Sequence, residues 1–444
     1  MSNNMKTAII ILAAGKGTRM KSNTPKVLHS IAGKSMIMHV LDIALELNPQ
    51  KIITVLSKDT LSVKDQISDY SDIAIQDEQL GTAHAVKSAL PLLDGFEGNI
   101  LILYADTPLI TIETLNNILA TLKDDNKACV LGFEPEDAAE YGRLKIDKNN
   151  NLLEIIEFKD AKDKEREIKI CNSGVMAIKS AQLQQLIDKI DNNNAKNEYY
   201  LTDLVDLVNK NANKVAWTKG DEEEVMGIND RSQLSHAEYV FQQRMRKKAM
   251  LSGITLLAPE TVFFSHDTQI ANDVIIHQNV VFGPKVNIAS NVEIKPFSHI
   301  EGADIASGCV IGPYARLRPG TVLENDVKIG NFVETKKSSI GKNSKISHLS
   351  YIGDSVVKDE VNIGAGTVTC NYDGYDKFQT IIETGAFVGS NTAIISPVKV
   401  GAGSIIGAGS VITKDVKEDS LTVSRPKQIS KENWAAEFRK SKEN

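Results

Sequence analysis

Residues 388–412 read VGSNTAIISPVKVGAGSIIGAGSVI, and in this stretch an aliphatic residue recurs at every sixth position. The recurring residues are Val388, Ile394, Val400, Ile406 and Ile412. A helix with 3.6 residues per turn cannot keep a strict six-residue period on one face, whereas short strands joined by tight turns can. The stretch therefore predicts a parallel β-helix, in which each coil places one apolar residue per face in a central stack.

The same period extends far upstream of this stretch. It runs through Ile270, Ile276, Phe282, Ile288, Ile294 and Ile300, slips by one residue, and resumes at Ile305, Ile311, Leu317, Leu323 and Ile329, then at Ile340, Ile346 and Ile352. The period is lost in CNYDGYDKFQTII, residues 370–382. Long loops in compact repeats are usually functional, and three aromatic residues favour a functional loop here over a disordered excursion.

The N-terminal half has a different organisation, in which short apolar runs alternate with helical patterns. We predict buried strands at Thr7–Leu12, Lys51–Leu56, Asn99–Tyr104 and Lys127–Phe133, and helices at Ser35–Leu47 and Thr111–Leu122. Such alternation is typical of an α/β domain, with a mostly parallel sheet covered on both faces.

A helix is expected to join the two halves. Residues 231–251 read RSQLSHAEYVFQQRMRKKAML, contain no glycine or proline, and are followed by Gly253 as a stop signal. We predict three parts: a domain at 1–229, a helical linker at 230–251 and the β-helix with its tail at 252–444.

The loop LAAGKGTRM, residues 12–20, follows the first predicted strand. Its glycines fit neither a Walker A loop nor a Rossmann fingerprint. Glycines still let backbone N–H groups approach an anion, and Lys16, Arg19 and Lys26 add positive charge. The loop therefore indicates phosphate binding at the carboxyl ends of the strands, with a plain turn carrying solvated charges as the alternative.

Other polar residues are candidates for chemistry. Asp106 follows the strand Asn99–Tyr104 and could hold Mg²⁺, or could be only an N-cap or turn aspartate before the helix at Thr111. In the repeats, His348 could act as a general base, a role for which histidine is the commonest side chain, or could be an ordinary surface histidine. Further candidates are Gln76–Thr82, Asn229, Arg318, Lys336, Tyr351, Asn362, Asn371, Tyr372 and Ser390.

Composition excludes several classes of protein. The net charge is −6 and aromatic residues make up 5%, which argues against a nucleic-acid partner. The four cysteines contain no CxxC pair, so neither a disulfide framework nor a zinc site is expected. No apolar run approaches the roughly 20 residues needed to span a bilayer, and we find no signal peptide, so we expect a cytoplasmic protein without membrane contact.

The combination of motifs resembles known families. The N-terminal half resembles the sugar-nucleotide pyrophosphorylases, whose signature is L-A-A-G-x-G-T-R-M followed by P-K, and the C-terminal half resembles the left-handed β-helix acyltransferases of the hexapeptide-repeat type. Joined in this order, with IGNFVETKKS (329–338), SHLSYIGD (347–354), NIGAGTVTCNYDG (362–374) and VGSNT (388–392), they resemble the bacterial bifunctional N-acetylglucosamine-1-phosphate uridylyltransferases/glucosamine-1-phosphate N-acetyltransferases.

The resemblance implies a Rossmann-like nucleotidyltransferase domain and a left-handed parallel β-helix. It implies a first site that binds UTP and N-acetylglucosamine 1-phosphate, with Mg²⁺ held by Asp106 and Asn229. The residues implied at this site are Leu12, Ala13, Ala14, Gly15, Arg19, Lys26, Gln76, Gly81, Thr82, Tyr104, Asp106, Gly142, Glu157, Asn172 and Asn229. Ala105, where the family usually has glycine, and Phe158, where it tends to be polar, are departures that bear on selectivity.

The resemblance also implies an acetyl-transfer site with His348 as the catalytic base. The sugar phosphate would contact Arg318, Lys336, Tyr351 and Asn362, and acetyl-CoA would contact Ala365, Asn371, Tyr372, Ser390, Ala408 and Arg425. A homotrimer and a role in cell-wall synthesis are implied as well. The alternatives are a nucleotidyltransferase whose β-helix is only structural or regulatory, and a solenoid scaffold without enzymatic activity.

Overall fold

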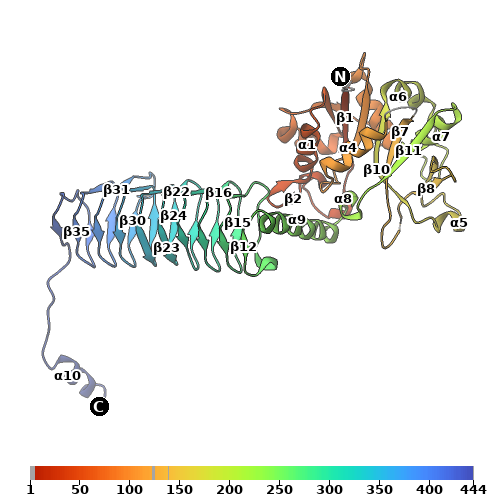
Figure 1. Ribbon diagram of the computed structural model, residues 1–444. Coiled ribbons are helices and arrows are strands. Elements are labelled where there is room, and N and C mark those ends of the chain that lie inside the picture. The colour runs from red at the N-terminus through yellow and green to blue at the C-terminus, as the bar shows by residue number, and fades with distance from the viewer. Residues whose placement is uncertain (1–5, 123–125, 139, 444) are drawn as a thin grey trace. The chain divides into compact units, whose positions relative to one another are not determined.

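The computed structural model describes residues 6–122, 126–138 and 140–443 (Figure 1). The chain forms two compact units, Met1–Gln242 and Gln243–Asn444. The boundary between them falls within helix α9 (Arg231–Leu251). The bounds of α9 confirm the helix predicted for residues 231–251. The predicted three-part division of the chain stays a prediction.

The N-terminal unit is built on a mixed sheet with strand order β11-β7-β10-β6-β1-β4-β5. Strand β10 runs antiparallel to β6 and β7, and the other pairs along this path are parallel, so the predicted mostly parallel sheet is confirmed. The hairpin of β8 and β9 extends from β10. The strands are β1 (Thr7–Leu12), β4 (Lys51–Leu56), β5 (Asp72–Ile75), β6 (Asn99–Tyr104), β7 (Asn126–Phe133), β8 (Arg143–Ile146), β9 (Leu152–Ile156), β10 (Cys171–Lys179) and β11 (Lys214–Lys219).

Helices cover both faces of this sheet, because successive side chains of a strand point to opposite sides. On β1, Ile9 and Ile11 pack with α1 and α4, whereas Ala8 and Ile10 pack with α3, α6 and α7. Fully burying an isoleucine side chain contributes roughly 1.5–3 kcal/mol, so both layers hold the strand in place. The helices are α1 (Met36–Glu46), α4 (Ile112–Thr121), α3 (Thr82–Ala89), α6 (Ser180–Leu186) and α7 (Asp203–Lys210).

The C-terminal unit is a parallel β-helix with three sheets, of ten, eight and eight strands (Figure 1). In the ten-stranded sheet, the residues in register are Ile276, Ile294, Ile311, Ile329, Ile346, Ile363, Val388 and Ile406, and all are buried. This confirms the fold predicted from the six-residue period. The strands that carry candidate residues are β21 (Arg316–Leu317), β23 (Lys328–Asn331), β24 (Glu334–Lys336), β26 (Lys345–His348), β27 (Tyr351–Gly353), β29 (Asn362–Ile363), β30 (Val368–Cys370), β31 (Thr380–Ile382), β32 (Phe387–Val388), β35 (Ile405–Ile406) and β37 (Leu421–Thr422).

A buried threonine explains one gap in the sequence period. Thr335 pairs with Leu317 and Ile352 in its sheet and is fully buried, so it occupies an inward position of the stack. Its hydroxyl lies 3.0 Å from that of Thr321, which satisfies both groups in the apolar interior.

The loop at residues 371–379, between β30 and β31, is an ordered hairpin. Ile363 pairs with Val388, 25 positions further on, whereas Val388 pairs with Ile406, 18 positions on, so this coil carries seven extra residues. Tyr372 and Lys377 form an antiparallel bridge across the hairpin. The loop is therefore ordered, and the alternative of a disordered excursion is wrong. Beyond β37 an exposed tail leads to helix α10 (Trp434–Lys440).

Candidate active sites

The first candidate site is a cavity of about 310 Å³ at the carboxyl ends of the central strands of the N-terminal unit. Gln79, from the predicted polar segment Gln76–Thr82, also lines it, as do Val27, Ala85 and Glu198, which were missed by the sequence analysis. Ten predicted residues line it: Leu12, Ala13, Ala14, Gly15, Lys26, Gln76, Gly81, Thr82, Tyr104 and Asp106. These residues come from the ends of β1 and β6 and from the segments that follow β1, β5 and β6, which the parallel sheet brings to one edge.

Two glycines in these loops are required by close packing. Gly17 has φ 60°, and a Cβ there would lie 2.5 Å from the Cβ of Lys26. Gly81 has φ 119°, and a Cβ there would lie 2.5 Å from the carbonyl oxygen of Tyr199. Other residues rarely adopt such φ values, so both positions depend on glycine. The first of them lets the loop approach the Lys26 side chain.

Lys26, Asp106 and Asn229 converge at the edge of this cavity. The Lys26 ammonium donates to Asp106 Oδ2 and lies 3.2 Å from Asn229 Oδ1. The backbone N–H of Ile228 donates to the Asp106 carbonyl at 2.9 Å, which ties the two loops together. The Thr111 hydroxyl caps α4, so Asp106 is not its N-cap, although Asp106 does lie in the turn that follows β6.

Three predicted sugar contacts lie together outside the described lining of this cavity. The Asn172 N–H donates to the Gly142 carbonyl at 2.8 Å, and a Cβ on Gly142 would lie 3.6 Å from the Glu157 carboxyl group. Glu157 Oε1 accepts a hydrogen bond of 3.2 Å from the Thr202 hydroxyl. Burial raises the pKa of Glu157 above its ordinary value. Burial also raises the pKa of Tyr104, so its hydroxyl stays protonated near neutrality.

Two of the cations expected in the loop are solvated. Arg19 lies on η1 (Thr18–Met20), is exposed and does not line the cavity. Lys16 is also exposed, and its ammonium lies 3.7 Å from Asp59. The alternative of solvated charges therefore describes these two side chains, whereas Lys26 is held inside.

Two residues depart from the family pattern, Ala105 and Phe158, and they lie in different environments. The Ala105 side chain is fully buried in the core and does not line the cavity. The Phe158 ring has guanidinium groups over it, with Arg166 at 4.9 Å and Arg143 at 5.7 Å from the centroid. A polar residue at position 158 could not make these cation–π contacts.

The second candidate site lies on the β-helix, where three cations gather. Arg318 donates to Glu334 at 2.7 Å. The contact with Lys377 lowers the pKa of the Lys336 ammonium, and the charge of Arg318 adds to this effect. Lys377 belongs to the hairpin of residues 371–379 and was missed by the sequence analysis, which expected a function there but singled out only Asn371 and Tyr372. Clustered cations of this kind suit a phosphate group.

His348 is held by a neighbouring asparagine. His348 Nδ1 lies 2.6 Å from Asn331 Oδ1, and the two residues pair directly between β23 and β26. Because an amide oxygen only accepts, Nδ1 donates this hydrogen bond, and in the neutral imidazole Nε2 then carries the lone pair. The exposed imidazole is therefore in the tautomer that a general base needs, and Asn331 is a second residue that the sequence analysis missed.

Four candidate residues occupy equivalent turn positions in successive coils. His348, Ala365, Ser390 and Ala408 fall at the end of, or two residues after, strands of the ten-stranded sheet. The Asn391 N–H donates to the Ala365 carbonyl at 2.7 Å, the Gly409 N–H donates to the Ser390 carbonyl at 2.8 Å, and the Arg425 guanidinium donates to the Ala408 carbonyl. These contacts form a ladder of small residues that leads away from His348. We call it the turn ladder.

The other predicted residues of this site lie on neighbouring elements. Tyr351 pairs with Glu334 in the sheet, and a Cβ on Gly353 would lie 2.5 Å from the Tyr351 hydroxyl. Asn362 begins β29, one coil beyond Lys345. The buried Asn371 amide donates to Asp354, whereas Tyr372 is exposed and its hydroxyl donates to the Gly374 carbonyl within the hairpin.

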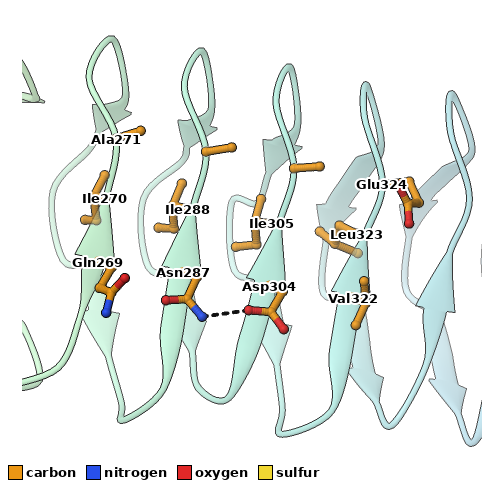
Figure 2. Close-up of a pocket in the computed structure, with 12 residues that line it drawn as sticks. Gln269, Ile270, Ala271, Asn287, Ile288, Asp304, Ile305, Val322, Leu323 and Glu324 are labelled. Carbon is orange, nitrogen blue, oxygen red and sulfur yellow. Dashed lines mark hydrogen bonds between the residues drawn. The ribbon is translucent and has the colours of Figure 1, made fainter.

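A larger cavity, of about 540 Å³, lies on another face of the β-helix (Figure 2). It runs across β13 (Gln269–Ile270), β16 (Val286–Ile288), β19 (Ala303–Ile305) and β22 (Thr321–Leu323). Its polar side chains include Asn287, which donates to Asp304 at 2.7 Å. No predicted site residue is in its described lining, so volume alone does not locate the chemistry.

Fold and sites together define a nucleotidyltransferase unit joined to a hexapeptide-repeat transferase unit. Residues 9–157 match the MobA-like NTP transferase domain family, and residues 379–414 match the bacterial transferase hexapeptide family, with six repeats. The C-terminal unit is accordingly a left-handed parallel β-helix. Among the described residues, no helix is long and apolar enough to cross a membrane.

Relatives named bifunctional protein GlmU match nearly the full chain. The protein from Paramagnetospirillum magneticum is 48% identical over 98% of this chain and 97% of its own length. Those from Sphingopyxis alaskensis and Zymomonas mobilis subsp. mobilis are 47% and 45% identical, over 98% and 100% of this chain and 97% and 99% of their own lengths. The chain belongs to the GlmU family of bifunctional enzymes, and the alternative of a scaffold without activity is excluded.

Proposed function

We propose that this enzyme makes UDP-N-acetylglucosamine in two steps at two separate sites. The β-helix transfers an acetyl group from acetyl-CoA to glucosamine 1-phosphate, and the N-terminal unit then transfers a uridylyl group from UTP to the product. The observation that carries the proposal is the contrast between the sites. At one site the Lys26 ammonium lies beside Asp106 and Asn229, with no histidine in the described lining, and at the other a histidine is oriented by Asn331.

Uridylyl transfer requires positioning and charge neutralisation. A phosphate oxygen of N-acetylglucosamine 1-phosphate attacks the α-phosphorus of UTP, and pyrophosphate leaves with the electron pair of the broken bond. The attacking oxygen is already anionic, so no protein base is needed. Lys26 and backbone N–H groups of the loop after β1 neutralise phosphate charge, with Leu12, Ala13, Ala14 and Gly15 lining the nucleotide. Gln76, Gly81 and Thr82 contact the uracil, and Arg19 would have to turn inward to reach a phosphate.

Asp106 and Asn229 suit a magnesium ion. Their side-chain oxygens already share one cation, the Lys26 ammonium, so they converge within reach of a single positive charge. Carboxylate and amide oxygens are ligands that Mg²⁺ prefers, and it usually takes few protein ligands beside substrate phosphates. When bound, the ion would supply further charge neutralisation at the phosphates. Tyr104, Gly142, Glu157 and Asn172 would hold the sugar.

Acetyl transfer requires removal of a proton. The substrate ammonium loses a proton to His348 Nε2, and the amine attacks the thioester carbonyl, so that an amide bond forms and coenzyme A leaves as the thiol. Asn331 holds the imidazole in the required tautomer. Arg318, Lys336 and Lys377 bind the sugar phosphate, with Tyr351 and Asn362 near the sugar. Acetyl-CoA lies along the turn ladder and contacts Ala365, Ser390, Ala408 and Arg425.

We further propose a homotrimer of cytoplasmic chains, with acetyl-transfer sites at the seams. A row of exposed apolar side chains supports it. The rings of Phe297 and Tyr314 stack at 4.9 Å, those of Tyr314 and Phe332 stack at 5.1 Å, and Leu349, next to His348, is 60% exposed. Identical chains usually cover such surfaces by closed cyclic symmetry. Asn371, Tyr372 and the tail would then complete a neighbour's site.

One assay tests the two-step function. The enzyme is incubated with glucosamine 1-phosphate, acetyl-CoA and UTP, and the products are identified by mass. We expect UDP-N-acetylglucosamine, coenzyme A and pyrophosphate. If the β-helix were only structural, coenzyme A release would be absent, and UDP-N-acetylglucosamine would form only from pre-acetylated sugar phosphate.

A further inference from the structure

The side chain of Gln76 is held in one orientation where strand β5 ends. The residue is 3% exposed and lines the cavity of about 310 Å³ described above, which we call the first cavity. Its Nε2 donates to the Gly81 carbonyl at 3.1 Å and lies 3.2 Å from Nδ1 of His84, a residue of helix α3. Its backbone N–H donates to the Leu56 carbonyl at 2.8 Å, so the main chain at this position is fixed as well.

The Gly81 carbonyl identifies the amide atom that faces it. A carbonyl oxygen only accepts, so the group beside it must be the NH₂ group of Gln76 and not the amide oxygen. The segment around Gly81 is held on both sides, because the Tyr199 N–H donates to the Leu80 carbonyl at 2.8 Å and the Ala83 N–H donates to the Tyr199 carbonyl at 2.9 Å. The carbonyl therefore stays in place as a reference for the amide.

His84 supplies the second acceptor for the same NH₂ group. Because Gln76 Nε2 is a donor, His84 Nδ1 accepts, and in the neutral imidazole the ring proton is then on Nε2. A side chain that only filled space on α3 would account for the bulk of the ring. It would not account for an acceptor placed against the Gln76 amide.

The amide oxygen of Gln76 is the atom that remains for a ligand. Oε1 has no hydrogen-bond partner within the described residues, yet it is not sealed in the interior. With both N–H groups used inside the protein, Gln76 offers the first cavity an acceptor and no donor. Uracil carries an N–H group at ring position 3, whereas cytosine carries a lone pair there.

We propose that His84 is a positioning residue that favours uracil over cytosine, because it holds the Gln76 amide with its oxygen toward the base. The inference rests on the proposed function, which assigns Gln76 to the uracil. Uracil N3–H donates to Oε1, whereas N3 of cytosine would meet Oε1 lone pair to lone pair. A site built to hydrogen-bond a substrate N–H disfavours an analogue that lacks it. Without the acceptor on His84, only the Gly81 carbonyl opposes rotation of the amide, so the penalty on cytosine falls.

Steady-state kinetics with UTP and with CTP test this role on the full chain. Pyrophosphate release from each nucleotide with N-acetylglucosamine 1-phosphate is measured, and the ratio of the two kcat/KM values gives the discrimination. His84→Leu and His84→Phe remove the acceptor. We expect each to raise the KM for UTP and to lower the ratio by about fivefold, the effect of one neutral hydrogen bond, with little change in kcat for UTP.

Two further variants separate the acceptor from the shape of the side chain. His84→Asn places Oδ1 near the position of Nδ1, so it should restore most of the discrimination. Lys87→Ala, which changes an exposed side chain on the same helix, is the matched control and leaves the ratio unchanged. A variant that is only less well folded loses activity with both nucleotides equally, so its ratio does not move.

The outcomes distinguish this inference from the proposed function. A wild type that turns over UTP while His84→Leu and His84→Phe keep its ratio would overturn the positioning role alone. Equal losses of discrimination in His84→Asn and His84→Leu would also overturn it, because the acceptor would then not be the cause. A wild type that used UTP and CTP equally would reject the selectivity, whereas a wild type that released no pyrophosphate from UTP would reject the proposed function as well.

Discussion

His348 Nδ1 lies 2.6 Å from Asn331 Oδ1, and the two residues are direct neighbours in the pairing of β23 with β26. This contact fixes the imidazole tautomer, so His348→Ala and Asn331→Ala affect the same step to different degrees. Loss of the base lowers acetyl transfer by about 10²–10⁴-fold, and loss of the orienting hydrogen bond lowers it by up to about tenfold. Coenzyme A release measures both.

The pH profile distinguishes orientation from a merely structural role. Asn331→Asp places a carboxylate beside the imidazole, which favours its protonated form. The acidic limb of kcat/KM for acetyl transfer therefore moves to higher pH. Asn325→Ala, at an exposed position of the same domain, is the control and leaves the profile unchanged. An unmoved limb in Asn331→Asp would count against the role of Asn331.

Lys377 should contribute to binding of glucosamine 1-phosphate. Its closeness to Lys336 is unfavourable without an anion between them, and a bound phosphate relieves this repulsion. We expect Lys377→Ala to raise the KM for glucosamine 1-phosphate about tenfold with little change in kcat, and Lys377→Arg to retain most of the affinity. Lys358→Ala, an exposed lysine elsewhere on the β-helix, should have no effect. Equal KM values for the two alanine variants would disprove the role.

The metal proposal predicts that the two activities respond differently to chelation. Removal of Mg²⁺ with EDTA stops uridylyl transfer and leaves acetyl transfer nearly unchanged, because the proposed acetyl-transfer step uses His348 and no metal ion. Asp106→Ala has the same selectivity and lowers uridylyl transfer by orders of magnitude. Pyrophosphate and coenzyme A release are measured on the same preparation. Comparable loss of both activities in a folded variant would reject the assignment.

Asp203 should lower stability near neutral pH. An unfolded aspartate titrates at about 3.9, whereas in the fold burial, followed by the charges of Asp191, Glu157, Asp206 and Asp160, raises the pKa of Asp203 to about 6. Between these values the folded state keeps a proton that the unfolded state has lost. The stability therefore falls as the pH rises from about 4 to 6 and stays at the lower level above that range.

Asp203→Asn removes this ionisation, so it should raise the free energy of unfolding at pH 7.5, and the gain should vanish near pH 4. The chain has two tryptophans, Trp217 on β11 and Trp434 on the exposed helix α10. In a Trp434→Phe background, tryptophan fluorescence reports unfolding of the N-terminal unit alone. A gain that is the same at both pH values would show that the charge of Asp203 is not its cause.

Assembly can be tested by mixing inactive chains. His348→Ala chains and chains with both Asn371→Ala and Tyr372→Ala are co-assembled and verified as mixed trimers. If seams join residues of two chains, some seams carry two wild-type contributions and acetyl transfer returns. Mixed trimers that stay inactive would show that each acetyl site is built from one chain.

The β-helix was predictable because its core follows directly from a linear period. Ile294 and Ile311, like Ile276, are in register because each coil repeats the same short strands and turns. The gap in the period at Thr335 was not predictable, because the sequence does not distinguish a buried threonine that has a hydroxyl partner from an exposed threonine. In the N-terminal unit, the antiparallel direction of β10 was also not predictable from the sequence, since a buried strand has the same composition in either direction.

The sequence predicted some residues of the candidate sites and missed others. The loop from Leu12 to Gly15 was found from its glycines, and the sheet then brought Tyr104 and Asp106 to the same edge, as strand order requires. Asn331 and Lys377 were missed because each is an ordinary polar residue along the chain. Their importance comes from pairing across coils, which only the register reveals.

The seven extra residues in one coil leave the strands before and after them in register. The central stack therefore tolerates length variation at a corner without refolding, because the inward side chains of neighbouring coils remain in contact. Substrate preference and stability can then change independently of each other in this architecture. Transplanting a corner segment between such proteins should transfer recognition while preserving the scaffold, which makes the corner at residues 371–379 a natural site for directed evolution.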